Sequence, residues 1–338
     1  MNPFNVSRPV CIIGLGLIGG SLLRDLAGLK HPVFGYNRST SGTRRAVKQG
    51  YDVSNDLPEV LQRAEREQAL IVIAVPFSAV FEVLDEVAAH APSCGITDVV
   101  SVKAPVYKAV LAHGMESRYV GGHPMAGTAH SGWDASHTGL FRGAAWAVTY
   151  DYAAESERVE RCWTELFTDV VKLISMVKAE AMPVRVKKHD EAVARVSHLP
   201  HVIAEALAVT GDRGGILSQS LAAGSFKDAT RVAGTRPELV RQMCETNSAA
   251  VVKAIDEFMG VLEHARDNLA APEPSIAKLA DAGFAARTRL EARTGARRES
   301  VSPVKISSRP VLRLSLGGHG WVDQLRQAES MGGRIEVF

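Results

Sequence analysis

A histidine in an unusual setting is the first candidate for chemistry. The run GGHPMAGTAHSGW covers residues 121–133 and places His123 between two glycines and a proline. Glycine and proline predict turns, so we expect a flexible, polar loop and no packed element here. A neutral imidazole is the usual general base near neutral pH, but a lone loop histidine is more often structural. His123 is therefore a candidate base whose assignment depends on its surroundings.

A glycine-rich turn near the N-terminus is the second candidate site. Gly14, Gly16 and Gly19 form G-L-G-L-I-G directly after the apolar run VCII. The first glycine permits a tight turn, the second lets backbone approach a pyrophosphate, and the third allows close helix–strand packing. Leu17 and Ile18 begin a helix whose N-terminus faces the phosphate. This strand–turn–helix context predicts a dinucleotide site; the alternative is a glycine turn without a ligand.

The residues after the second predicted strand indicate which dinucleotide binds. An NAD-preferring site usually carries an acidic residue there, for the ribose 2′-hydroxyl. This chain has Asn37, Arg38, Ser39 and Thr40 instead. A guanidinium and hydroxyls favour a 2′-phosphate, so we expect NADP, with NAD possible but less favoured. The alternative is that Arg38 faces solvent and stacks on adenine.

Elements that could position these residues alternate along the first half of the chain. Strands are predicted at 10–16, 33–37, 69–75, 96–101, 118–122 and 144–150, with one more at 170–176. Helical stretches such as SLLRDLAGL and SAVFEVLDEVAAH lie between them. The alternation predicts an α/β fold with an N-terminal Rossmann-type doubly wound sheet. Ligands bind at the carboxyl ends of such strands, so Val75 and Pro76 join the expected cofactor contacts.

The pattern changes after about residue 178. Apolar residues recur at every third or fourth position up to about residue 293, which predicts an all-α domain. Residues 293–310 are rich in Arg, Ser and Pro and predict a linker. The final residues predict a short C-terminal β-α-β extension, too small to be stable alone. The expected division is 1–178, 179–293 and 294–338.

Composition excludes several classes of protein. Hydrophobic residues make up 46% of the chain and charged residues 22%, and the formal net charge is +2. This balance demands no polyanion, so we expect no nucleic-acid partner. The four cysteines are scattered without a C-x-x-C pair, which predicts neither disulfides nor a metal site. No apolar run is long enough to span a membrane and no signal pattern is present, so we expect a cytoplasmic location.

Five segments occur in an order that resembles a known family. They are GLGLIGGSL, VVSVKAP, GGHPMAGTAHSG, KKHDEAVARVSHLPH and FKDATRVAGTRPELVRQMCETN. Together they closely resemble the prephenate and arogenate dehydrogenases of tyrosine biosynthesis, over about residues 8 to 290. The resemblance implies a Rossmann domain followed by an all-α dimerisation domain, and hence a homodimer. It also implies oxidative decarboxylation of arogenate, prephenate or both, with hydride passing to NADP.

The resemblance also implies roles for individual residues. His123 would accept the proton of the ring C4 hydroxyl. Ser101 and Thr128 would contact the same region, and His198 would line the substrate site. Arg231 would pair with the ring carboxylate, for which its guanidinium offers a bidentate fork.

Structural interpretations compete with several of these roles. His201 is expected to be a core histidine, and Arg231 could pair with Asp228 within its own helix. His189 and Asp190 form either a structural pair or a pair that borders the site. Surface positions are open to three histidines: His130, His137 and His189.

Two other classes of protein share the expected two-domain plan. One is a β-hydroxyacid dehydrogenase or imine reductase, in which Lys187, Lys188 or Lys227 would be the catalytic lysine. The other is an NADP-sensing regulator without activity. Within the resembled family, Ala129 replaces an acid that many members carry. This replacement and the NADP-type pocket favour arogenate over prephenate, because members with NADP pockets are frequently arogenate enzymes.

Overall fold

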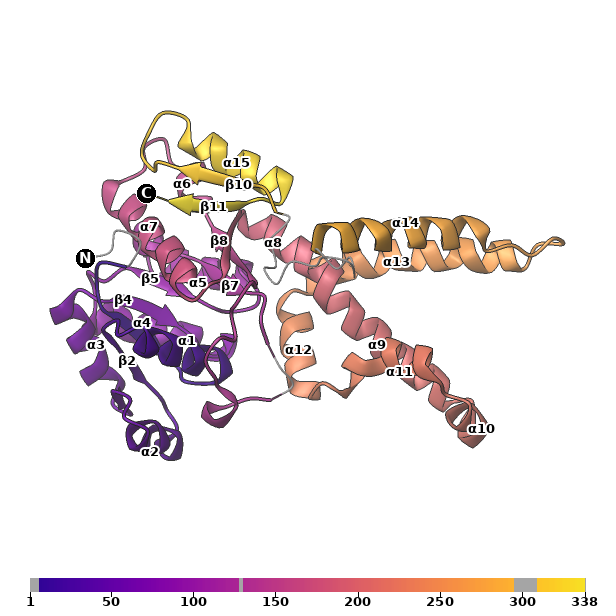
Figure 1. The fold of residues 1–338 in the computed structure, drawn as a ribbon, viewed down its shortest axis with the longest axis horizontal. Helices are drawn as coiled ribbons and strands as arrows, with labels where there is room; N and C mark the ends of the chain where they lie inside the picture. The colour runs from indigo at the N-terminus through magenta and orange to yellow at the C-terminus, as the bar shows by residue number, and fades with distance from the viewer. Residues whose placement is uncertain (1–5, 128–129, 295–308, 338) are drawn as a thin grey trace, which may run out of the picture. The chain divides into compact units, whose positions relative to one another are not determined.

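The computed structural model describes residues 6–127, 130–294 and 309–337. The chain divides into two compact units, Met1–Asp190 with Val311–Phe338 and Glu191–Pro310 (Figure 1). The first unit extends beyond the expected boundary at residue 178, and it includes the C-terminal extension. None of the helices in the described ranges is both long and apolar enough to cross a bilayer.

A six-stranded parallel sheet forms the centre of the first unit, in the order β3-β2-β1-β4-β5-β6. Its strands are β1 (Val10–Ile13), β2 (Val33–Tyr36), β3 (Val53–Ser54), β4 (Leu70–Ile73), β5 (Ile96–Asp98) and β6 (Tyr119–Val120). Both faces are buried: Val10 and Ile12 of β1 enter one apolar core, whereas Cys11 and Ile13 enter the other. Such strands need apolar residues on both sides, which explains why they appear as continuous runs. The Rossmann-type sheet is confirmed.

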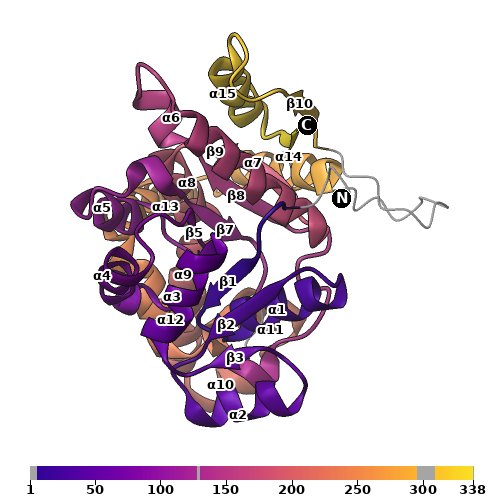
Figure 2. The same cartoon turned by 90° about the vertical axis from the view of Figure 1, so that its left-hand side faces the viewer.

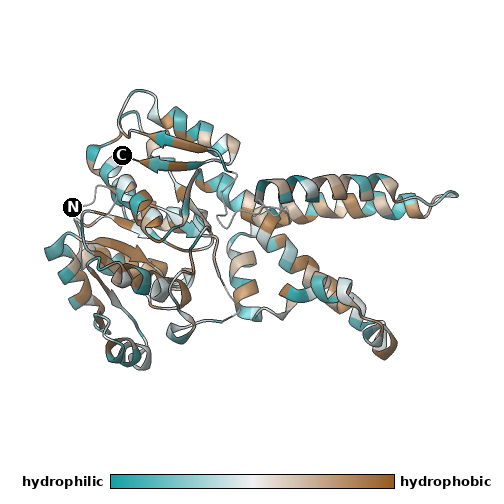
Figure 3. Ribbon diagram, in the orientation of Figure 1, coloured by the Kyte–Doolittle hydropathy of each residue, from teal (hydrophilic) through white to brown (hydrophobic). Residues whose placement is uncertain are grey.

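Helices cover the two faces of this sheet (Figure 2). The helices of the first unit up to residue 176 are α1 (Leu17–Gly28), α2 (Thr40–Lys48), α3 (Leu57–Glu67), α4 (Val80–His90), α5 (Ala104–Ala112), α6 (Asp151–Glu155) and α7 (Arg161–Met176). Leu22, Leu23 and Leu26 of α1 lie in the same core as Val10. Val83, Leu84 and Val87 of α4 lie in the core on the other side. In Figure 3 the strands of this sheet are mostly brown, that is hydrophobic, whereas the helices around them carry both hydrophilic and hydrophobic residues.

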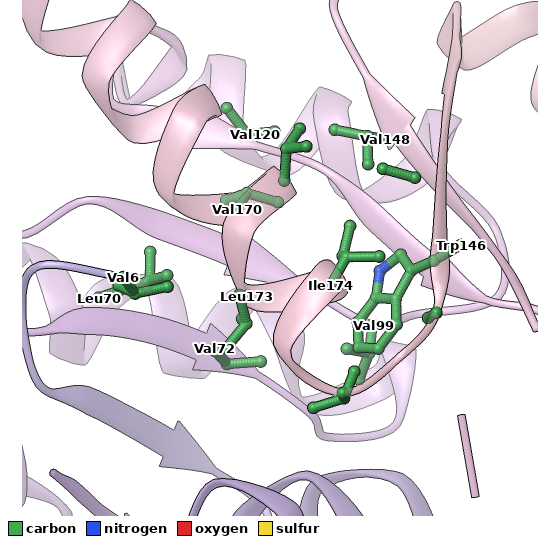
Figure 4. Close-up of a cluster of buried hydrophobic side chains, with 14 of the residues drawn as sticks. Val6, Leu70, Val72, Val99, Val120, Trp146, Val148, Val170, Leu173 and Ile174 are labelled. Atoms are coloured by element: carbon green, nitrogen blue, oxygen red, sulfur yellow. The ribbon is translucent and has the colours of Figure 1, made fainter. Parts of the chain in front are cut away.

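The predicted strand at 170–176 is wrong, because these residues are the last two turns of α7. Val170, Leu173 and Ile174 are buried on one side of this helix, beside Val72 of the parallel sheet (Figure 4). Their spacing of three and four is that of a helix face. The strand that does follow is β9 (Glu180–Val184), in a segment expected to be helical. It pairs in parallel with β8 (Ala145–Thr149), and β8 pairs antiparallel with β7 (Gly122–Pro124).

The C-terminal extension is the predicted β-α-β unit, and it packs on the first unit. It consists of β10 (Val311–Leu314), α15 (Trp321–Met331) and β11 (Arg334–Val337), with the two strands parallel. Glu329 of α15 is largely buried and accepts hydrogen bonds from the Tyr150 hydroxyl at 3.0 Å and from the Arg185 backbone amide at 2.7 Å. The second bond ties the extension to the residue that directly precedes α8 (Val186–Val193).

The second unit is helical, as expected. After the shared helix α8, a π-helical turn, η4 (Ala194–His198), leads into α9 (Leu199–Asp212). The remaining elements are α10 (Gly215–Ser220), α11 (Gly224–Thr230), the 3₁₀ turn η5 (Arg231–Gly234), α12 (Pro237–Thr246), α13 (Ser248–Leu269) and α14 (Ala277–Thr294). A small buried cluster of Ala194, Val251 and Ala254 joins η4 to α13.

Candidate active site

A pocket of about 600 Å³ lies where β1, β2 and β4 end. The glycine turn, the residues after β2 and the residues after β4 line it together with the start of α4. The expected cofactor residues on its wall are Gly14, Gly16, Asn37, Arg38, Ser39, Val75 and Pro76. The carboxyl ends of parallel strands are where such folds bind ligands. The other expected cofactor residues are not among the lining residues: Leu17, Ile18 and Gly19 lie in the first turn of α1, and Thr40 is the first residue of α2.

The three glycines of the turn differ in what a side chain would meet. Gly14 has φ +103°, and an added Cβ would lie 2.6 Å from the Ala74 carbonyl oxygen. A Cβ on Gly19 would lie 2.0 Å from the Gly14 carbonyl oxygen, so this position needs glycine for close helix–strand contact. A Cβ on Gly16 would meet no protein atom within 4 Å, although Gly16 lines the pocket. The turn therefore leaves open backbone at the position where a pyrophosphate would approach.

The start of α1 offers backbone donors to such a group. Gly16 is the N-cap residue and has no side chain to satisfy the first amides of this 12-residue helix. Unsatisfied amides and the helix dipole favour an anion at this end. The residues present thus fit the diphosphate of a dinucleotide.

The segment after β2 is polar and exposed. Ser39 caps α2 by accepting a hydrogen bond from the Gly42 amide at 3.2 Å, and its hydroxyl lies 3.2 Å from that of Ser41. Arg38 is exposed on the pocket wall. Acidic side chains from α4 also line the pocket, namely Glu82, Asp85 and Glu86. Arg38 is the only one of the described lining residues with a positively charged side chain.

His123 lies in a short strand, so the expectation of a flexible loop without a packed element is wrong at this point. It belongs to β7, opposite Ala147 of β8. Gly122 makes the strand possible, because a Cβ there would lie 2.6 Å from the Asp98 carbonyl oxygen and 2.9 Å from Trp146 Nε1. The glycines beside His123 thus serve close packing in addition to turning the chain.

A chain of hydrogen bonds leads from His123 into the protein. His123 Nδ1 lies 2.9 Å from His189 Nε2, and His189 Nδ1 lies 2.7 Å from Asp190 Oδ1. The Asp190 carboxylate also accepts from the backbone amides of Lys103 at 2.8 Å and Ala104 at 2.7 Å. Burial acts to raise the pKa of Asp190, but the hydrogen bonds from His189 and the two amides together hold it below its ordinary value.

A buried ion pair supports the same backbone. The ammonium of Lys103 pairs with Asp98 and donates to the Gly122 carbonyl at 2.7 Å. Both side chains are fully buried. Burial lowers the pKa of Lys103, although Asp98 acts in the opposite direction. The pair fixes the residue that precedes His123 against the end of β5. Ser101 lies exposed in the same loop, two residues before Lys103.

The sequence did not identify His189 as a partner of His123. A surface position for His189 is wrong, because its side chain is 3% exposed. His130 and His137 are exposed, as one alternative had it. Lys103 and Asp98 were also missed. The motifs KKHDEAV and VVSVKAP contain His189 and Lys103, and Asp98 directly precedes the second motif, but nothing in the sequence shows that these residues meet.

The second unit holds the other two expected substrate residues. His198 is 1% exposed at the end of η4, and the Asn247 side-chain amide lies 3.2 Å from its Nδ1. A π-turn of this kind is frequent at functional sites. Arg231 is exposed at the start of η5, and within the described part of the chain it forms no ion pair with Asp228. His201 is half-buried and bonds to the Ser197 carbonyl. Thr128 and Ala129 lie outside the described residues.

Two family models match the chain. They describe the nucleotide-binding domain of prephenate dehydrogenase, over residues 20–174, and its dimerization domain, over residues 185–280. A cyclohexadienyl dehydrogenase of Zymomonas mobilis is 32% identical over 282 residues, which cover 79% of this chain and 90% of that protein. A prephenate dehydrogenase of Lactococcus lactis is 30% identical over 260 residues, which cover 74% and 68%.

Solved structures are similar as well. A protein of Corynebacterium glutamicum, described as a candidate prephenate dehydrogenase, is 55% identical with a TM-score of 0.92, covering 99% of this chain and 100% of its own. Synechocystis arogenate dehydrogenase is 27% identical with a TM-score of 0.72, covering 83% and 99%. Prephenate dehydrogenase of A. aeolicus, in complex with hydroxyphenyl propionate and NAD+, is 26% identical with a TM-score of 0.71, covering 84% and 98%.

Proposed function

We infer the reaction from one premise: the chain belongs to the prephenate dehydrogenase family. Its relatives carry the names prephenate, cyclohexadienyl and arogenate dehydrogenase. We propose that it oxidatively decarboxylates arogenate, prephenate or both in tyrosine synthesis, with NADP as the hydride acceptor. The observation that carries this proposal is the His123 imidazole, which is held through Nδ1 by the buried His189–Asp190 pair.

The proposed chemistry gives each residue a task. The substrate is a cyclohexadiene with a carboxylate and a side chain at C1 and a hydroxyl at C4. His123 takes the hydroxyl proton while hydride leaves C4 for the nicotinamide that the bound cofactor supplies. The C1–carboxylate bond then breaks, CO2 leaves, the electron pair of that bond completes the aromatic ring, and the C4 oxygen takes a proton back to give the phenol. Formation of the aromatic ring supplies the driving force of the reaction. The tasks left to the protein are to orient the hydroxyl and to remove its proton.

The remaining proposed residues bind the substrate. Arg231 anchors the ring carboxylate with a guanidinium fork. His198 can donate from Nε2, because the Asn247 amide supplies the proton to its Nδ1. Ser101 and Thr128 contact the region of the C4 hydroxyl. None of these side chains needs to change its charge during the reaction.

Steady-state kinetics with both substrates and both cofactors test the proposal. We expect turnover with arogenate or prephenate, arogenate being preferred, and NADP favoured over NAD by at least about tenfold in kcat/KM. One charge-assisted contact to a 2′-phosphate contributes about 1.5–3 kcal/mol, which is enough for that ratio. The absence of turnover with both substrates would refute the function, and equal use of NAD would refute the cofactor preference alone.

Variants after β2 separate the pocket from the reaction. Asn37→Asp with Arg38→Ala should reverse or abolish the preference for NADP, because a carboxylate repels the phosphate and suits a free ribose hydroxyl. Arg66→Ala removes an exposed arginine from α3 and is the matched control. If the control changed the NADP/NAD ratio as much as the double variant, net charge rather than the pocket would set the preference.

We also propose a homodimer joined through the second unit. The majority of the exposed large apolar side chains among the described residues belong to the second unit. They include Ile216, Leu217, Leu221 and Phe284, which are between 72% and 83% exposed. The buried cluster of this unit is small, so a monomer would leave much apolar surface in water. Light scattering at micromolar concentration should give twice the 36.3 kDa chain mass, and a monomer would contradict the proposal.

A further inference from the structure

His189 stands between the proposed base and a buried carboxylate. Its two ring nitrogens face His123 at 2.9 Å and Asp190 at 2.7 Å. The planes of the two imidazoles are 70° apart, so the ring edge of His189 meets the Nδ1 side of His123. All three residues lie in the first unit, on β7 and α8.

The state of Asp190 follows from its donors. Two backbone amides, those of Lys103 and Ala104, donate to its two oxygens. An amide can only donate, so these bonds favour the ionised carboxylate, which accepts at both oxygens. The carboxylate at 2.7 Å then requires the hydrogen on Nδ1 of His189. A neutral His189 consequently has a bare Nε2, which is an acceptor.

The order of donors extends to His123. Because His189 Nε2 accepts, His123 Nδ1 must carry the hydrogen of the bond between the two rings. We propose that His189 and Asp190 are positioning residues that hold His123 in the Nδ1–H tautomer, in which Nε2 carries no hydrogen and is the nitrogen that acts as the base. This proposal rests on the proposed function, in which His123 removes the substrate's hydroxyl proton. Neither positioning residue gains or loses a proton in the reaction.

The same arrangement stabilises His123 once it has taken the proton. An imidazolium donates more strongly from Nδ1 than a neutral ring, and the carboxylate polarises His189 as the acceptor. The Asp190 carboxylate contacts His189 directly, and the Lys103–Asp98 pair, whose opposite charges cancel, bonds to the Gly122 carbonyl next to His123. The net effect is to favour the protonated form, so His123 should be a stronger base with His189 than without it.

Two substitutions of His189 test this role. His189→Phe fills the space but offers no acceptor, whereas the amide oxygen of His189→Gln can occupy the position of Nε2. We expect the Phe variant to lose roughly 10- to 100-fold in kcat with KM within about twofold. Its acid limb in log kcat should move to lower pH by about one unit, because the imidazolium has lost its acceptor. The Gln variant should recover most of both changes.

The tautomer can also be measured without turnover. In the ¹⁵N-histidine-labelled wild-type protein, long-range ¹H–¹⁵N correlation separates protonated from bare ring nitrogens, and His123→Asn identifies the signals of residue 123. We expect hydrogen on Nδ1 in both His123 and His189. Hydrogen on Nε2 of His123 would overturn the proposal even if His189→Phe did not fold.

The outcomes distinguish this proposal from the proposed function. A wild-type protein that turned over neither substrate would remove the function. A working enzyme in which His189→Phe and His189→Gln showed the same kcat and pH profile as wild type would remove only the positioning role. Equal losses in the Phe and Gln variants, without a shift of the acid limb, would make His189 a packing residue.

Discussion

Replacing His123 by asparagine should lower kcat by about 100-fold or more and leave KM within a few fold. General-base catalysis typically contributes 10²- to 10⁴-fold, and this substitution removes the base. An asparagine amide reaches the position of Nδ1, so it can still donate to His189 and fit β7. The loss should therefore fall on the chemical step, which kcat reports, while substrate binding is retained.

The pH dependence gives this prediction its sign. The base must be unprotonated before hydride transfer, so log kcat of the wild-type enzyme should fall on the acid side. One group should account for the limb, in the range of about pH 6–7 where imidazole ordinarily titrates. In His123→Asn that limb should vanish, because the titrating group is absent. A variant that kept wild-type turnover would return His123 to a structural role.

His137→Asn is the matched control for this substitution. His137 is an exposed histidine 14 residues further along the chain, and its Nδ1 lies 3.0 Å from the neighbouring Thr138 carbonyl oxygen. Its removal should leave kcat and the acid limb unchanged. If both variants lost activity equally, the effect would come from the conformation of the 121–139 segment and not from a base.

Much of the first unit could be predicted because burial leaves a direct signal. Strands such as β1 and β4 are covered on both faces, and their residues alternate between two apolar cores. This environment requires a continuous apolar run, which is visible in VCII and LIVI. The same kind of apolar run at residues 170–176 led to the wrong prediction of a strand. The side of a helix that packs on a sheet, here Val170, Leu173 and Ile174, also gives an apolar stretch when only a few residues are considered. The length of the stretch and the spacing of its apolar residues are needed to distinguish a helix from a strand.

The residues of the candidate active site could be proposed from the sequence one at a time, but their arrangement could not. His123 was recognisable from its glycine-rich setting and the resemblance. Its partner His189 is 66 positions away and on a different element. No periodicity links the two, because their contact depends on how α8 meets β7. The structure supplies that contact, and the order of donors that we propose for the three side chains follows from it.

Replacing Arg231 by alanine should act on binding where His123→Asn acts on the chemical step. The ring carboxylate is present in the substrate and during hydride transfer, so its anchor contributes similarly in both states. Loss of one charge-assisted fork, about 1.5–3 kcal/mol, should raise KM by roughly 10- to 150-fold with a much smaller change in kcat. Arg231→Lys should recover only part of this, because an ammonium keeps the charge but not the bidentate geometry. Arg236→Ala, which removes another exposed arginine from the same unit, should change KM little.

The product provides the sharper test of Arg231, because it has lost the ring carboxylate as CO2. The affinity for tyrosine or 4-hydroxyphenylpyruvate should therefore be nearly the same in the wild type and in Arg231→Ala, while the apparent affinity for the substrate falls. Competitive inhibition by product, measured beside substrate KM in both proteins, gives the two quantities under one set of conditions. If product affinity fell as much as substrate affinity, Arg231 would contact the side chain that substrate and product share, and the assignment to the ring carboxylate would be wrong. If neither changed, the exposed guanidinium would have no part in binding, and the anchor of the substrate would have to be sought in another cationic group.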